Sequence, residues 1–406
     1  MNRDKSATSA AMTSRERVLA AMRRQPVDHL PLCVEAICHG FVRFVTERLP
    51  SPFERAEYYA GLGLDAAICL DSAMCDPDAN PGVEVRQWKE QPTGEPHPVL
   101  CKEYRTPGGS LRQVVSITDD YANDYFSRGR DSLSMFSDYH VPAHRSRQYL
   151  VEKEADLDGL AYLLRPLSGK ALESYRDKAR RARQFCNEHQ LTLTAYHLGV
   201  GDPIIWMSGV ERTLQMAMEE EVFFRRYVQL VASWQRQELE IVLEAGAGHI
   251  VRRGIYESTD FWSPQLFETF LLGPLRDEAA LIHQAGATVG YAMLSGYMPL
   301  LDLIKKAGLD MLSNLDPVAH GTDIRAIRAA IGDAVAVCGG VNNYLVLEKG
   351  TEHDVRRAVR DAMAVFTPTT GCILAPSDCI LSYDNEPVAE RNFHAMIATW
   401  RESIRG

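Results

Sequence analysis

Side chains that can exchange protons recur directly after the apolar segments of this chain. Tyr196 and His197 end one apolar segment, Glu257 follows the next, and Asp378 follows the last. A phenol, an imidazole and carboxyl groups can act as general acids or bases when a substrate lies within hydrogen-bond reach. We therefore predict that these four side chains carry catalysis. For His197, a structural hydrogen bond is the alternative.

The adjacent pair Arg252 and Arg253 could bind an anion. Neighbouring residues on a strand point to opposite faces, so one guanidinium should face the interior of the fold and the other the surrounding helices. The inward one could hold a substrate carboxylate through two parallel hydrogen bonds. An ion pair with Glu35 or another carboxylate is the alternative. The sequence does not decide which arginine faces inward.

Further residues that follow apolar segments are candidates for substrate binding. Met293 and Trp262 would suit an aromatic or methylated substrate. The polar candidates are Glu35, His39, Asp260, Ser295, Asn314, Asp316 and Asn342. Polar groups at this density are costly to bury unless they meet partners or a ligand. Taken together, they indicate a binding site.

Short apolar segments, separated by amphipathic stretches, must position these residues. Thr13 and Glu16 form a capping pattern for a first helix, and the predicted strands are 29–36, 62–71, 191–200, 248–256, 287–296, 308–317, 334–343 and 371–378. The predicted helices that follow are 209–219, 221–245, 264–285, 298–307, 323–331, 352–366 and 386–403. This alternation predicts parallel β/α units, and a count of eight predicts a (β/α)8 TIM barrel. In such a barrel the carboxyl ends of all strands surround one opening.

A doubly wound open sheet is the structural alternative. It would place a glycine-rich fingerprint after its first strand, and CVEAICHG (33–40) is not one.

We expect a single domain over residues 13–406, preceded by a disordered tail at 1–12. Residues 76–145 interrupt the alternation with several prolines and with alternating segments at 83–88 and 110–117. This pattern predicts hairpins inserted after the second strand, which could form a lid over the barrel opening.

Composition excludes several classes of protein. The 406 residues are 46% hydrophobic and 24% charged, which is typical of a globular protein. A net charge of −10 argues against a nucleic-acid partner. Nine cysteines without a CxxC pair indicate reduced thiols, and no apolar run approaches the ~18 residues that span a bilayer. We therefore predict a cytoplasmic protein that acts on a small molecule, away from membranes.

Several motifs resemble those of the uroporphyrinogen decarboxylase superfamily, which also contains cobalamin-dependent methyltransferases. They are RERVLAAMRRQPVDHLPL (15–32), PLLDLIKKAGLDMLSNLDP (299–317) and GCILAPSDCI (371–380). The resemblance implies a barrel enzyme for a small organic substrate. We favour methyl transfer or demethylation with a corrinoid-binding protein as partner, in which Asp378, Glu257 or Tyr196 would protonate the leaving heteroatom. A decarboxylase (carboxy-lyase) acting on a small carboxylate is the alternative. The resemblance also leaves open a homodimer.

The chain departs from this superfamily in an N-terminal segment. True uroporphyrinogen decarboxylases carry an arginine-rich segment after the first strand, whereas CVEAICHGFVRFV (33–45) contains Glu35, His39 and a single arginine, Arg43. An acidic rim would repel a substrate with many carboxylates. We therefore do not expect uroporphyrinogen decarboxylation.

The zinc-binding pattern of the methyltransferases is also altered. In place of a His-x-Cys-Gly motif the chain has Met293, Leu294, Ser295 and Gly296. Asp378 takes the place of a later cysteine ligand, with Cys379 beside it. Catalytic zinc needs about three protein ligands, so a site would have to be rebuilt from residues such as Asp378, Cys379, Glu257 or His197. We therefore predict no tightly bound cofactor, and Asp378 and Cys379 as the ligands of any metal; an ordinary buried thiol is the alternative for Cys379.

Overall fold

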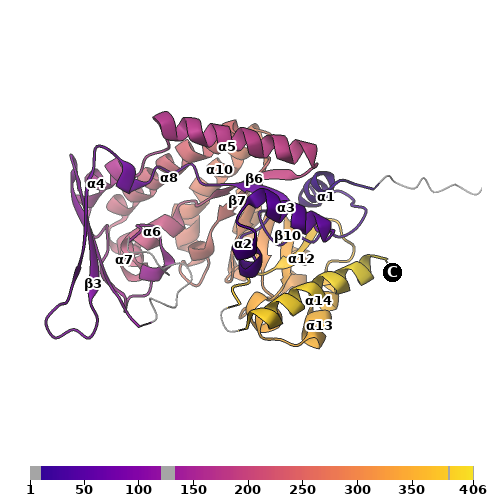
Figure 1. The fold of residues 1–406 in the computed structure, drawn as a ribbon. Helices are drawn as coiled ribbons and strands as arrows, with labels where there is room; N and C mark the ends of the chain where they lie inside the picture. Colours follow the sequence, from indigo (N-terminus) through magenta and orange to yellow (C-terminus); the bar gives the residue numbers. More distant parts are fainter. Residues whose placement is uncertain (1–10, 120–132, 383–384, 406) are drawn as a thin grey trace, which may run out of the picture.

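The computed structural model describes residues 11–119, 133–382 and 385–405 (Figure 1). Most of the predicted tail, residues 1–10, lies outside the described residues. The first helix, α1 (Ser14–Met22), begins with the predicted capping box between Thr13 and Glu16. All nine cysteine thiols are free. Among the described residues, none of the helices is both long and apolar enough to cross a membrane.

A curved parallel sheet forms the centre of the fold. Its order is β1-β6-β7-β8-β9-β10-β11, with bounds β1 (Ala67–Leu70), β6 (Thr192–His197), β7 (His249–Arg253), β8 (Thr288–Ala292), β9 (Met311–Leu315), β10 (Ala336–Val341) and β11 (Cys372–Pro376). Each strand lies inside a predicted one. The strands are almost entirely buried because helices cover the sheet. Their sequential order has no reversal point, which argues against the doubly wound alternative.

The remaining predicted strand, 29–36, is present as a single bridge. Leu32 pairs with Leu374 of β11 in parallel, and the carbonyl of Leu32 accepts a hydrogen bond from the amide of Asp65 at 3.0 Å, just before β1. One residue therefore contacts both edges of the seven-stranded sheet, which shows that the sheet curls back on itself. A longer ladder does not form, because Pro31 has no N–H to donate and Ala36 has a left-handed backbone with φ of 69°.

Helices connect successive strands of this sheet. From α7 onward they lie close to the predicted ranges, whereas α2 to α6 lie in no predicted range. The helices before β6 are α2 (Arg43–Arg48), α3 (Pro52–Gly61), α4 (Asp156–Leu163) and α5 (Gly169–Glu188). Those that follow are α6 (Gly201–Ser208), α7 (Val210–Glu219), α8 (Glu221–Glu244), α9 (Pro264–Leu266), α10 (Leu272–Gln284), α11 (Leu301–Ala307), α12 (Ile324–Ile331), α13 (Glu352–Val365) and α14 (Glu386–Arg405). One π-helical turn (Phe267–Leu271) joins α9 to α10, and another (Asn343–Glu348) precedes α13.

A second, antiparallel sheet lies between β1 and α4 in the sequence. Its strands are β2 (Glu84–Glu90), β3 (Val99–Thr106), β4 (Gly109–Ser116) and β5 (Ser146–Gln148), in that order. It packs against α4, and in Figure 1 it lies on the other side of the view from α13 and α14. Residues 120–132 of the predicted lid lie outside the described residues.

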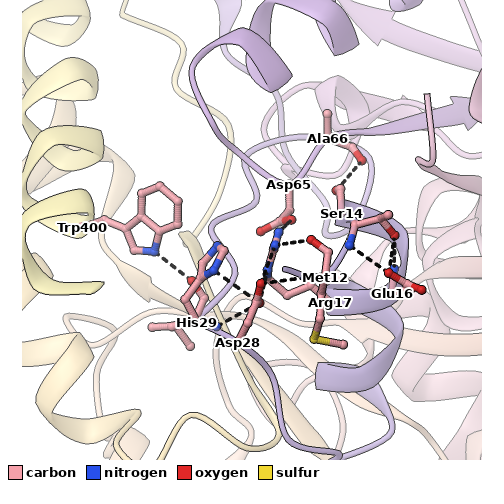
Figure 2. A network of polar contacts seen from close by, with 11 residues as sticks. Met12, Ser14, Glu16, Arg17, Asp28, His29, Asp65, Ala66 and Trp400 are labelled. Atoms are coloured by element: carbon pink, nitrogen blue, oxygen red, sulfur yellow. Dashed lines mark hydrogen bonds and ion pairs between the residues drawn. The ribbon is translucent and has the colours of Figure 1, made fainter. Parts of the chain in front are cut away.

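A polar network fixes the amino-terminal ends of the strands (Figure 2). Arg17 of α1 forms ion pairs of 2.6 Å with both Asp28 and Asp65. Trp400 of α14 donates a 2.9 Å hydrogen bond to the carbonyl of Leu30. The network thus links α1, the segment before Leu32, the residues before β1 and the last helix. These contacts therefore hold together the segments that lie before the strands.

Candidate functional site

A cavity of about 400 Å³ lies at the carboxyl ends of β1, β6 and β7. Cys69 of β1, Tyr196 of β6, and Val251 and Arg253 of β7 contribute to its wall. The other lining residues are Glu35, Ala36, Cys38, His39, Gly40, Phe41, Phe136, Ser137, Asp138 and Trp206. They come from the segment after Leu32, from the segment between β4 and β5, and from α6. Its position agrees with the general location of active sites in parallel α/β barrels.

Arg253 is the arginine that faces this cavity, and its charge is already balanced. Its Nε lies 3.0 Å from Oδ2 of Asp202, and its Nη2 lies 3.1 Å from Oδ1 of Asp138. The guanidinium also lies over the ring of Trp206, 4.6 Å from the centroid. Only 6% of Arg253 is exposed. Two carboxylates thus hold the guanidinium in place. Arg253 therefore forms ion pairs within the protein, which was the alternative to binding a substrate carboxylate.

The two carboxylates respond differently to their surroundings. Burial raises the pKa of Asp202 to about 7, an effect that the nearby Arg253 only partly offsets. Burial also acts on Asp138, but Arg253 and hydrogen bonds from Tyr256 and Trp206 outweigh it and lower its pKa. Asp138 is therefore a stable anion at the cavity wall.

Arg252 points to the opposite side of the sheet, toward α10. Its Nε lies 2.9 Å from Oε2 of Glu278, and its Nη1 pairs with Glu257. Tyr291 also donates a 2.6 Å hydrogen bond to Glu257, and Nε2 of His197 lies 3.5 Å from Oε1 of Glu278. These five side chains form a buried ionic network behind the sheet. Three predicted site residues, His197, Arg252 and Glu257, therefore lie in this network and do not line the cavity.

Strand alternation explains this division. Tyr196 and Arg253 face the cavity, so their neighbours His197 and Arg252 must face the helices. Within the network, burial alone would raise the pKa of Glu278, but Arg252 and His197 lower it to about 2.

Four predicted site residues, Tyr196, His39, Asp378 and Cys379, form a cluster beside the cavity. The hydroxyl of Tyr196 is hydrogen-bonded to Nδ1 of His39, and Nε2 of His39 lies 3.7 Å from Oδ1 of Asp378. One donor atom each from His39, Asp378 and Cys379 lie within 4.8 Å of one another. Such a set of imidazole, carboxylate and thiol could hold a metal ion.

Burial favours the neutral forms of three side chains of this cluster, Tyr196, Cys379 and His39. It raises the pKa of both the Tyr196 phenol and the Cys379 thiol well above their usual values. It lowers the pKa of His39, against the attraction of Asp378. The phenol therefore holds its proton at neutral pH.

Asn314 holds the two segments of this cluster together. Its Oδ1 accepts a 3.1 Å hydrogen bond from the amide of His39, and its Nδ2 donates to the carbonyls of His39 and, at 2.9 Å, of Ser377. Asn314 is fully buried and has a left-handed backbone with φ of 67°, a conformation that asparagine adopts more readily than most residues. Asn314 was predicted to bind substrate. In the structure its side chain instead positions His39 and the residues that follow Ser377.

Of the other predicted binding residues, only Glu35 is among the described residues that line the cavity. Glu35 accepts a 2.9 Å hydrogen bond from Arg55. The rest are not among the lining residues: Asp260 is hydrogen-bonded to Ser295, Asp316 to Asn342 at 2.8 Å, and Trp262 and Met293 are buried in the core. Asp138 and Trp206 line the cavity but are not among the residues predicted for the site. No local pattern marks Asp138, which lies in the segment predicted as a lid.

One comparison with known proteins shows the family of this chain. The family model described as "Uroporphyrinogen decarboxylase (URO-D)" matches residues 167–402. No curated protein matches the chain. Among solved structures, a methyltransferase from Methanosarcina mazei is similar with a TM-score of 0.58 and 17% identity, covering 97% of this chain and 99% of that one. D-psicose 3-epimerase from Clostridium cellulolyticum H10 follows with a TM-score of 0.35 and 11% identity, covering 56% of this chain and 84% of that one. At 17% identity the first match shows a common fold.

Proposed function

This chain belongs to the uroporphyrinogen decarboxylase (URO-D) family, and from that premise we propose that it is a methyltransferase. Its substrate would be a small methoxylated or methylated compound bound in the 400 Å³ cavity. The acceptor would be a corrinoid carried by a separate protein that docks at the opening. When bound, the corrinoid supplies the atom that takes the methyl group.

The observation that carries this proposal is the pairing of Arg253 with Asp138 and Asp202. Among the described residues that line the cavity, Arg253 is the one arginine and lysine is absent. A substrate carboxylate would therefore have to displace a carboxylate of the protein from Arg253. It would also approach Glu35 and Asp138, which are acidic. This charge distribution disfavours anionic substrates, including the decarboxylase alternative.

The remaining wall suits a neutral or cationic substrate. Phe41, Phe136, Tyr196 and Trp206 provide aromatic surface. Aromatic rings stack on a methoxylated ring, and they also attract methylated ammonium groups through their negative faces. The volume lies within the range of about 300–1,000 Å³ that is usual for small-molecule sites.

Tyr196 is the proposed acid. A methylated ammonium group would leave as a neutral amine without gaining a proton. When the bond from the methyl carbon to an ether oxygen breaks, however, the bond electrons remain on that oxygen, which must gain a proton. The phenol of Tyr196 can supply that proton, since it faces the cavity and stays protonated. A hydrogen bond from Nδ1–H of His39 would then stabilise the phenolate, which water reprotonates.

The test uses the purified full-length protein with cob(I)alamin and a panel of methoxylated aromatics and methylated amines. We expect the corrinoid absorbance to change with at least one donor, together with release of the demethylated product. Tyr196→Phe should lower the rate about 10²-fold or more. Tyr344→Phe, at an exposed tyrosine that does not line the cavity, is the matched control and should retain full activity. Absence of a spectral change with every donor, together with carbon dioxide release from a carboxylate, would overturn the proposal in favour of a decarboxylase.

A further inference from the structure

We propose that His39, Asp378 and Cys379 form a zinc site that opens toward the cavity. The ligands come from two segments at opposite ends of the chain: His39 follows the Leu32 bridge, and Asp378 and Cys379 follow β11. Met293 and Ser295, which occupy the positions of the superfamily's His-x-Cys motif, are not part of it. The chemical role of the metal rests on the proposed function, whereas its binding rests on the geometry below.

The donor atoms are spaced almost as a bound metal requires. For tetrahedral zinc with bonds of about 2.0–2.3 Å, two ligand atoms lie about 3.3–3.8 Å apart. Nε2 of His39 and Oδ1 of Asp378 are 3.7 Å apart, which is inside that range. The three donor atoms all lie within 4.8 Å of one another, so closure around an ion needs movements of about 1 Å.

The second ring nitrogen of His39, Nδ1, has a hydrogen-bond partner, as is usual for histidines that bind a metal. Ligating histidines almost always bond through the second nitrogen to a neighbouring group that fixes the ring orientation. Nδ1 of His39 is bonded to Tyr196, which leaves Nε2 directed at Asp378. Tyr196 is in this respect a positioning residue for the ligand.

The backbone of both ligand segments is fixed in addition. Asn314 bonds to His39 and to Ser377, the residue before Asp378. Asn343 donates a 2.9 Å hydrogen bond to the carbonyl of Cys379. The two segments also run together at Gly40, where an added Cβ would lie 3.5 Å from the carbonyl carbon of Asp378. The ligands are therefore oriented before any ion arrives.

The cluster leaves room for a fourth ligand. The side chains of His39 and Asp378 are 23% and 32% exposed, whereas Cys379 is 5% exposed. Three protein ligands and one open position are typical of catalytic zinc. The donor set of nitrogen, oxygen and sulfur suits zinc better than the oxygen-only sites of magnesium or calcium. The open position would take the oxygen, nitrogen or sulfur atom of the substrate that carries the methyl group.

The test measures metal binding directly. The purified full-length protein is freed of metal with a chelator and titrated with Co²⁺ and, separately, with Zn²⁺ by calorimetry. We expect one ion per chain, and with Co²⁺ a near-ultraviolet absorption band from the bond between cobalt and sulfur. Cys379→Ser should lose the band, His39→Gln and Asp378→Asn should raise the Kd for zinc at least ~10-fold, and Tyr196→Phe should raise it ~10–100-fold.

Cys75→Ser is the matched control, at a partly exposed thiol next to Asp76. It should keep the band and the wild-type Kd. Thermal unfolding with and without zinc checks that each variant folds, and zinc should raise the melting temperature of the wild type and of Cys75→Ser but not that of Cys379→Ser.

The outcomes separate the metal site from the proposed function. A wild type without stoichiometric binding, or a Cys379→Ser variant that keeps the cobalt band, overturns the site. Methyl transfer at full rate by the metal-free protein overturns the metal's role and keeps the proposed function. Stoichiometric binding through these ligands, without methyl transfer to a corrinoid, supports the site and contradicts the proposed function.

Discussion

Asn314 binds both the amide and the carbonyl of His39 with a single side chain. The same side chain reaches the carbonyl of Ser377 at 2.9 Å. The end of β9 thereby fixes the position of His39 relative to Asp378. Asn314 does not line the cavity. Its side chain acts on the site indirectly, by fixing the backbone of His39 and Ser377.

Asn314→Ala should weaken both the fold and the cluster. Loss of the amide leaves backbone groups of His39 and Ser377 without their partner, at a cost of about 2–4 kcal/mol in the free energy of unfolding. Denaturant unfolding and the Kd for zinc measure the two effects. Ser313→Ala, at the buried neighbour that makes only a 3.4 Å hydrogen bond to Tyr291, is the control and should change little. An Asn314→Ala variant as stable as Ser313→Ala would contradict the positioning role.

At a pH above about 7, where Asp202 is ionised, Arg253→Met should destabilise the protein by about 3–5 kcal/mol, because it leaves the charge of the fully buried Asp202 without a partner. Combining Arg253→Met with Asp202→Asn removes that charge and should recover a large part of the loss. Urea unfolding of the two single variants and the double variant gives the coupling energy. Strictly additive effects would show that the pair is not coupled in the folded protein.

Glu257→Gln separates a structural from a catalytic role. Glu257 is fully buried and pairs with Arg252 behind the sheet, so its neutralisation should cost about 3–5 kcal/mol of stability. At a temperature where the variant is folded, kcat should stay within a few-fold of the wild type. A variant of normal stability whose kcat falls about 10²-fold would instead indicate that Glu257 is a catalytic acid or base.

Glu238 should make stability depend on pH. This carboxyl on α8 is 2% exposed, and burial raises its pKa to about 8 from the ordinary 4.5. The folded protein therefore retains a proton that the unfolded chain has released. The resulting stabilisation is full below about pH 4.5, declines as pH rises, and is lost above about pH 8.

Glu238→Gln should remove this dependence. The variant should match the wild type near pH 4.5 and exceed it by a few kcal/mol at about pH 9, since one pKa unit corresponds to about 1.4 kcal/mol. Denaturant unfolding at several pH values tests this. Glu240→Gln, at an exposed position of the same helix, should follow the wild-type profile. If the stability of Glu238→Gln also follows the wild-type pH profile, the pKa of Glu238 is not raised in the folded protein and the prediction is wrong.

Local patterns predicted most of the secondary structure. Strands β6 to β11 lie within their predicted ranges, and α7, α8 and α13 end within a residue of theirs. Strands and helices can be predicted in this way because apolar residues recur about every two residues in a strand and every 3.6 residues in a helix, a pattern that is visible in a short stretch of sequence. One exception is 29–36, where Pro31 and Ala36 limit pairing to Leu32. The helices α2 to α6 are another, since none of them lies in a predicted range.

The sequence by itself determined that Arg252 and Arg253 face opposite ways, because side chains alternate along any strand. Only the tertiary structure decided that Arg253 faces the cavity, since that depends on how β7 is rotated between β6 and β8. The same holds for Tyr196 and His197. The contact of His39 with Asp378 has no local signal either, because the curling of the sheet brings the first and last segments together.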